Sequence, residues 1–306
     1  MHLPGPLQEW IENLAAVYFE PPPGLGVDFT APPGAPALFA PDSVAWRVFK
    51  NPLALIVGGI AAVILELAEP RVRAGVWTHT SFRADPLTRM KRTGYAAMVT
   101  VYAPAEAARA MIAAISHRHG AIAGYTETGA PYRADDPELL DWVQATASFG
   151  FVEAYRRYAA PLTPDEIDRF YAESAPAAGL YGAHGAPRSA AQCAALFADM
   201  APKLERSEII FEFLRLVSAA PLLPAPLKAL QPTLIRAAVA TLPAWARDQL
   251  GLGPSYRLHF AERQLLSALG AGGERLQLER APAAQACRRL GLASDLLYRP
   301  HPHDKN

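Results

Sequence analysis

Three side chains on one short stretch, Arg89, Arg92 and Thr93, could hold an anionic or hydrogen-bonding group. Asp85 followed by Pro86 is typical of a helix start, because aspartate caps free N–H groups and proline tolerates the first helical position. Arg89 and Thr93 are four residues apart and therefore share one helix face. A guanidinium beside apolar side chains costs free energy unless it finds a partner. That partner is a helix end, a carboxylate or a ligand.

A second helix is expected over residues 104–120, directly after the first. Its apolar face includes Met111 and Ile115, and His119 is the next residue on that face. His117, two residues earlier, points away from it. An inward histidine is either a core residue bonded to a backbone carbonyl or a metal ligand, and spacing alone leaves both interpretations open.

The overall charge gives no electrostatic case for nucleic-acid binding, since 29 acidic residues balance 29 basic ones over 306 residues. Cys193 and Cys287 are far apart in the chain, which indicates neither a disulfide framework nor a zinc site. The N-terminal residues lack the basic leader and apolar run of a secretory signal. These features predict a cytoplasmic protein.

Residues 52–65 form the most apolar segment of the chain. The segment is shorter than the roughly 20 residues that a spanning helix needs, so we interpret it as a buried helix without a transmembrane role. It could also form the wall of a pocket for a hydrophobic ligand, and peripheral membrane contact stays open. Gly58 and Gly59 in its middle would permit close approach of another helix or of a flat ligand.

The remaining periodicity predicts an all-α protein with one main domain. We expect a helix and a proline-rich arm over residues 1–41, a helical domain over 42–298 and a disordered tail over 299–306. Residues 69–82 would bridge two helices, with His79 within the bridge. Residues 124–136 have the composition of a loop. Other helices are expected to begin at Asp42, Asp136 and Thr163, with the last ending near Phe170, followed by a glycine-rich loop after residue 175.

The common catalytic motifs are missing: the chain has no P-loop, no H-E-x-x-H, no G-x-S-x-G and no E-x-x-H pair. What remains for a helical protein with an inward histidine and arginines is a cofactor held between helices. Haem suits this arrangement, since it needs a neutral imidazole, an apolar slot and cations near its propionates.

Several linked segments resemble one known family. The chain reads DSVAWRV, NPLALIVGGI, EPRVRAGVWTHTSFRADPLTRMKRT, HGAIAG, PYRADDPELLDWVQAT and TLPAWARDQLGL, in the order seen in latex-clearing protein and MpaB-type oxygenases. The resemblance covers roughly residues 42–252. It implies a globin-like helical core, a b-type haem and insertion of dioxygen across carbon–carbon double bonds of isoprenoid or lipid-like substrates.

The resemblance also assigns residues. His119 begins an H-x-x-[VI]-x-G pattern and matches the axial iron ligand, while Arg89 and Thr93 match the R-x-x-x-T signature beside the haem. Arg92 stands where rubber-cleaving members can have a lysine. The family pattern therefore implies that His119 is the metal ligand, that Arg89 and Thr93 help to bind the cofactor, and that Arg89, Arg92 and Thr93 serve catalysis.

The chain departs from the family pattern at two places. Gln144 replaces a histidine in the W-x-H-x-T segment, and Glu69 replaces the histidine of an H-P pair. A glutamine cannot shuttle a proton near neutral pH. Two alternatives follow: a haem or lipid binder without oxygenase activity, and a structural protein in which Arg89 and Thr93 only satisfy helix ends. His79 is either a distal-site residue or, in the preferred interpretation, a loop histidine bonded to the backbone.

Overall fold

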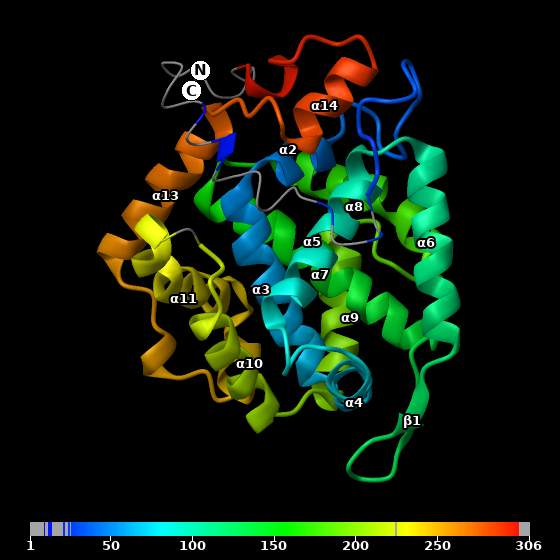
Figure 1. Ribbon diagram of the computed structural model, residues 1–306. Coiled ribbons are helices and arrows are strands. Elements are labelled where there is room, and N and C mark those ends of the chain that lie inside the picture. The colour runs from blue at the N-terminus through cyan, green and yellow to red at the C-terminus, as the bar shows by residue number, and fades with distance from the viewer. Residues whose placement is uncertain are drawn as a thin grey trace.

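The structure is a computed structural model that describes residues 26–299 except 224, together with residues 9, 12, 13, 21 and 24. It confirms the all-α prediction, with helices in every layer of the described chain (Figure 1). Its elements are α2 (Val44–Lys50), α3 (Pro52–Ala68), α4 (Pro70–His79), α5 (Pro86–Tyr102), α6 (Ala105–Gly120), β1 (Ala123–Tyr125), β2 (Pro131–Arg133), α7 (Pro137–Tyr158), α8 (Pro164–Leu180), α9 (Ala190–Met200), η1 (Ala201–Lys203), α10 (Glu208–Ala219), η2 (Ala225–Leu230), α11 (Gln231–Thr241), α12 (Ala244–Gln249), η3 (Pro254–Tyr256), α13 (Phe260–Arg275), α14 (Pro282–Arg289) and η4 (Leu296–Tyr298).

The core is built on α3, which is the buried helix that its apolar sequence predicts. Asn51 starts it by accepting hydrogen bonds from two backbone N–H groups of the first turn, and Pro52 occupies the first helical position. α7 packs along α3 so closely that Gly58 and Gly150 face each other without side chains between them. The expected close helix contact at Gly58 is confirmed.

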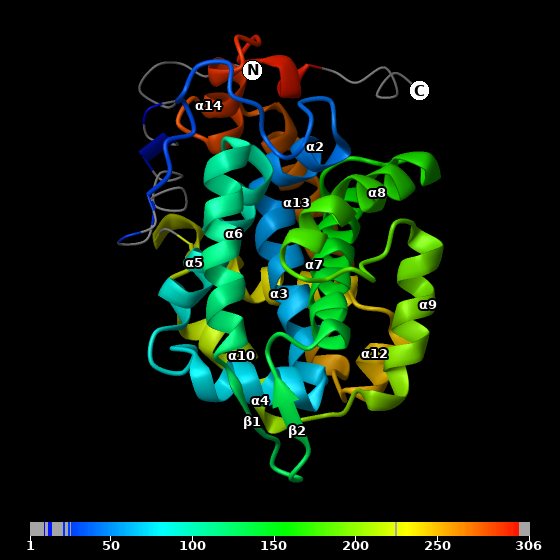
Figure 2. The same ribbon diagram turned by 90° about the vertical axis from the view of Figure 1, so that its right-hand side faces the viewer.

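A second pair of helices, α5 and α6, lies to the left of α3 in Figure 2, with α7 to the right. These two helices pack against each other, as α3 and α7 do, but close backbone approaches between the two pairs are sparse. Figure 2 shows α6 and α7 on either side, with α3 visible between them.

The interpretation of residues 124–136 as a loop was wrong in part, because β1 and β2 form an antiparallel hairpin. Gly124 pairs with Tyr132, and the turn between the strands uses Gly129 at φ 83°. A strand of three residues is too short to show a period of two in the sequence. Gly124 also makes room for the ring of Tyr132, since a Cβ there would lie 2.7 Å from its hydroxyl.

The bridge over residues 69–82 was also wrong in part, since most of it is the helix α4. Glu69 caps it by accepting a hydrogen bond from the backbone N–H of Val72. His79 ends the helix, and its Nε2 lies 3.1 Å from the hydroxyl of Tyr132 on β2. His79 therefore contacts a side chain, not the backbone as we expected.

Two further helix boundaries differ from the prediction. Ser43, not Asp42, caps α2, because its hydroxyl accepts a hydrogen bond from the N–H of Trp46. α8 begins in the expected capping box at Thr163 but continues past residue 175 to Leu180. Pro176 lies inside it, two residues before the glycine-rich sequence that we interpreted as a loop.

The arm over residues 26–41 contains no helix or strand, as its prolines predict. The helix expected over residues 7–20 and the tail after residue 299 lie almost wholly outside the described residues, and the domain limits stay a prediction. Within the described chain, no single helix is long and apolar enough to cross a bilayer. α2 and α3 reach that length only together, and the chain bends by 95° between them.

Candidate functional site

Arg89 and Thr93 lie on one face of α5 and contact each other, as their spacing predicts. The guanidinium of Arg89 donates to the hydroxyl of Thr93, which itself donates to the backbone carbonyl of Arg89 at 3.1 Å. The guanidinium also lies over the ring of buried Phe82, 5.9 Å from its centroid. Burial lowers the pKa of Arg89, and Glu66 opposes this shift. Arg89 is therefore a half-buried cation whose side chain is held against its own helix.

Glu66 of α3 is the residue that faces this cation. Burial raises the pKa of its carboxyl to about 7, although the positive charge of Arg89 lowers it. The side chain forms no hydrogen bond with the described residues and is half-buried. A carboxyl in such surroundings is more easily kept in its protonated form, because burial disfavours the charged form. Sequence analysis missed Glu66 as a site residue.

His119 lies in the last turn of α6. Its Nδ1 is buried and has no hydrogen-bond partner among the described residues, and the same holds for the hydroxyl of Ser116 one turn earlier. Burial lowers the pKa of His119, and the charge of Arg89 lowers it further. The imidazole is therefore neutral at neutral pH. A buried polar atom without a partner in the protein is a position at which a ligand is expected.

A groove opens beside His119 between the end of α6, the start of α7 and the end of α8. Its volume is about 450 Å³. Tyr181 in its wall reaches across to α5, where its hydroxyl lies 2.9 Å from that of Thr100. The lining residues are Ser116, His119, Asp135, Pro137, Leu140, Gly179, Leu180, Tyr181, Gly182 and His184.

Residues from three helices form what we call the interhelical site. On α3 these are Gly59, Val63 and Glu66, which recur at helical spacing and stay partly accessible although their neighbours are buried. Arg89 on α5 and His119 on α6 belong to the site, because the charge of Arg89 acts on both Glu66 and His119. The site therefore combines a partly accessible apolar helix face with a carboxyl, a guanidinium and an imidazole.

The remaining predicted residues have different surroundings, and not all of them lie near His119. Arg92 and Thr93 are exposed, and Arg92 lowers the pKa of Arg89 by charge repulsion. Gln144 is partly accessible and lies one turn along α7 from Leu140, which lines the groove beside His119. His79 contacts the hairpin and has no described contact with Arg89 or His119.

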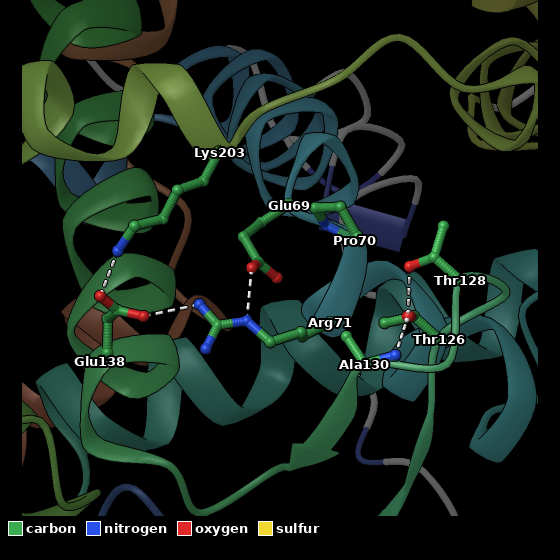
Figure 3. Close-up of a pocket in the computed structure, with 8 residues that line it drawn as sticks. All are labelled: Glu69, Pro70, Arg71, Thr126, Thr128, Ala130, Glu138 and Lys203. Carbon is green, nitrogen blue, oxygen red and sulfur yellow. Dashed lines mark hydrogen bonds and ion pairs between the residues drawn. The ribbon is translucent and has the colours of Figure 1, made fainter.

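A second pocket, of about 410 Å³, lies between α4, the hairpin and the start of α7 (Figure 3). Arg71 bridges Glu69 and Glu138, and Lys203 also contacts Glu138. Each charge in this row has an opposite charge beside it. The row therefore ties α4, α7 and η1 together and leaves no charge free for a ligand.

Comparison with known protein families shows which family the chain belongs to. Residues 46–271 match the family described as ER-bound oxygenase mpaB/B′/rubber oxygenase, catalytic domain. The chain belongs to this oxygenase family. Comparisons with curated proteins and with solved structures gave no match. The matched region begins in α2 and ends in α13, so it contains every residue of the interhelical site.

One signal in the sequence could have revealed Glu66. It follows Gly59 and Val63 at intervals of four and three residues, so it ends an apolar helix face with a carboxyl. Its proximity to Arg89 depends on the packing of two helices that are separate in the sequence, and no local pattern encodes that.

Proposed function

We propose that this protein is a haem b-dependent oxygenase that oxidises or cleaves a carbon–carbon double bond of a small hydrophobic substrate. The observation that carries the proposal is His119, a neutral imidazole with a buried, unpartnered nitrogen in a chain of an oxygenase family. Iron in haem proteins is commonly held by such an imidazole.

The residues around His119 fit haem. Its imidazole is already neutral and can bind iron without first losing a proton, because burial keeps its pKa low. Arg89 and Arg92 supply positive charge for propionates, and the apolar face of α3 supplies a surface for a flat ring. His119 would hold the iron, and Arg89 would anchor the group through a side chain already fixed by Thr93. When bound, haem supplies the activation of dioxygen.

The protein's own side chains would then bind substrate and move protons. The apolar residues of α3 would bind the hydrophobic chain and exclude water. Glu66 can accept or release a proton near neutral pH, because its pKa is about 7. Gln144 cannot do so, and Glu66 would therefore carry the proton transfer that the usual family histidine would otherwise support.

Haem content tests the proposal directly. We expect the purified wild-type chain to show a Soret band with about one haem per chain, and His119→Ala to lose it. His117→Ala is the matched control, since this histidine is exposed on the same helix two residues away. Unchanged haem in His119→Ala would rule out His119 as the ligand.

Oxygen consumption distinguishes an oxygenase from a haem or lipid carrier, the alternative that Gln144 favours. We expect uptake of dioxygen when an unsaturated lipid is added to the haem-loaded protein. Glu66→Gln should keep its haem and lose most of this uptake, because glutamine cannot accept the proton. A wild-type protein that binds haem and lipid without consuming oxygen would be a carrier.

A further inference from the structure

The groove beside His119 contains two buried polar atoms that have no hydrogen-bond partner among the described residues. They are Nδ1 of His119 and the hydroxyl oxygen of Ser116, and both residues line the groove. The two residues are three positions apart on α6, which is nearly one turn and about 4.5 Å along the helix axis. They therefore lie on the same side of α6, and a ligand that contacts one of them is within reach of the other.

The hydroxyl of Ser116 differs from other hydroxyls inside the helices of this chain. Thr100, Ser174 and Thr241 each donate to the backbone carbonyl four residues earlier, at 2.8 Å. This bond is a common way for a serine or threonine within a helix to satisfy its hydroxyl. Ser116 has no such partner in the described part of the chain. Its hydroxyl is therefore available as a donor, and a change of rotamer can turn it toward the groove without moving the helix.

Two other polar side chains of the groove are already bonded within the protein. Both carboxylate oxygens of Asp135 accept hydrogen bonds from Arg133, each at 2.9 Å, and the hydroxyl of Tyr181 is bonded to α5. Leu140 and Leu180 add apolar surface to the lining. The groove therefore suits a mostly apolar ligand with a polar group that accepts a hydrogen bond from the serine.

The charges around His119 indicate the nature of this polar group. Burial lowers the pKa of His119 most, the charges of Arg89 and Arg118 lower it further, and Asp135 raises it. The charge of Asp135 is itself compensated by Arg133. Positive charge is therefore in excess near the imidazole and favours an anion, although the C-terminal end of the helix dipole acts against it. A carboxylate is an anion to which a serine hydroxyl donates well.

We propose that Ser116 binds a carboxylate of the ligand that His119 holds. This inference rests on the proposed function, in which the ligand is haem, an apolar ring that carries propionate carboxylates. The hydroxyl of Ser116 donates a hydrogen bond to one carboxylate and so fixes how the ring is turned relative to His119. A fatty acid has the same chemistry, an apolar body with a carboxylate, and the experiment below separates the two ligands.

Reconstitution with haem and with haem dimethyl ester tests the proposal, because the ester has no free carboxylate. Ser116→Ala should bind haem about tenfold more weakly than the wild type, measured by the Soret absorbance, and should bind the ester as the wild type does. Ser116→Thr keeps the hydroxyl and should restore the binding of haem. Ser174→Ala is the matched control, since the hydroxyl that it removes already donates to Phe170. It should bind both compounds like the wild type.

The outcomes for Ser116→Ala separate the inference from the proposed function. Alanine is the better helix former, so the variant should fold. An unchanged affinity for haem, or an equal loss of affinity for haem and for the ester, would overturn the inference alone. Decanoate and decanol test the fatty acid as the source of the carboxylate. A wild type that binds no haem, but binds decanoate more tightly than decanol only when Ser116 is present, would overturn the proposed function alone.

Discussion

The charges of the site are set by their burial more than by their neighbours. Burial is the largest cause of the shifted pKa of Glu66, Arg89 and His119 alike. In each case it favours the uncharged form, and the opposite charges of Glu66 and Arg89 only partly compensate. The result is a carboxyl that titrates near neutrality beside an imidazole that stays neutral, which is a combination suited to ligand binding and proton transfer.

Glu66 should make the stability of the protein depend on pH. Its pKa is about 7 in the folded chain, against an ordinary value of 4.5. Between these two pH values the carboxyl is protonated in the folded chain and ionised in the unfolded chain. Stability therefore falls as pH rises through this window, by up to about 3 kcal/mol. Glu66→Gln should remove the effect, so the variant gains stability over the wild type at pH ~8 and little at pH ~5. Urea unfolding at both pH values measures this.

Glu262 provides a control, because its pKa is lowered in the folded chain whereas that of Glu66 is raised. Its hydrogen bond with Arg236 lowers its pKa to about 2, so its contribution is complete above its ordinary pKa of 4.5 and is lost only in acid. Glu262→Gln should destabilise equally at both test pH values. An identical pH slope in the wild type and in Glu66→Gln would show that Glu66 does not titrate in this window.

At the scale of the elements, one tight helix contact and one loose one create the site. α3 and α7 approach closely because Gly58 and Gly150 leave their backbones bare. α5 and α6 are joined by a short turn and pack on each other, and their close backbone approaches to the first pair are sparse. The same central helix therefore has a packed face at Gly58 and an accessible face at Gly59.

Gly58→Ala should be strongly destabilising, although alanine is the better helix former. Its methyl group would overlap the backbone of α7, so the helices must separate, at a cost of about 1–3 kcal/mol. Gly94→Ala on α5 is the control, since no atom lies within 4 Å of the added Cβ and helix propensity alone should stabilise by up to about 1 kcal/mol. Thermal unfolding of both variants compares them; similar stabilities would mean that the contact relaxes easily.

At the scale of the whole molecule, one buried arginine joins distant parts of the chain. Arg289 of α14 donates to the backbone carbonyls of Phe29 and Ala35 in the arm and of Tyr102 at the end of α5, at 2.6, 2.8 and 2.8 Å. Burial lowers its pKa, which reflects the cost of placing a charge there. The three carbonyls offset that cost and fix the arm beside the helix that carries Arg89.

Arg289→Met should therefore destabilise the whole fold. The methionine keeps much of the apolar volume but leaves three carbonyls without a donor, at a total cost of about 3 kcal/mol or more. Arg288→Met is the control, because Arg288 is exposed and pairs with Glu279 at the surface. Its loss should change stability by less than about 1 kcal/mol. The urea midpoint measures both; equal midpoints would show that the arm contributes little.

The sequence by itself determined the helices and most of their starts, because caps and apolar periodicity are local. Asp85, Asp136 and Thr163 each cap the helix that they predict. It also placed Arg89 and Thr93 on one face, since four residues make about one helical turn. The hairpin was not predicted, because its three-residue strands are too short to show alternating apolar and polar residues.

Only the tertiary structure decided which of these faces meet. Three features depend on segments that are far apart in the chain. The charge of Arg89 acts on Glu66, Gly58 and Gly59 have different neighbours, and Arg289 donates hydrogen bonds to the arm. The pKa of Glu66 depends on how much protein surrounds it, which no neighbouring residue specifies. For the same reason the neutrality of His119 became visible only once the helices around it were in place.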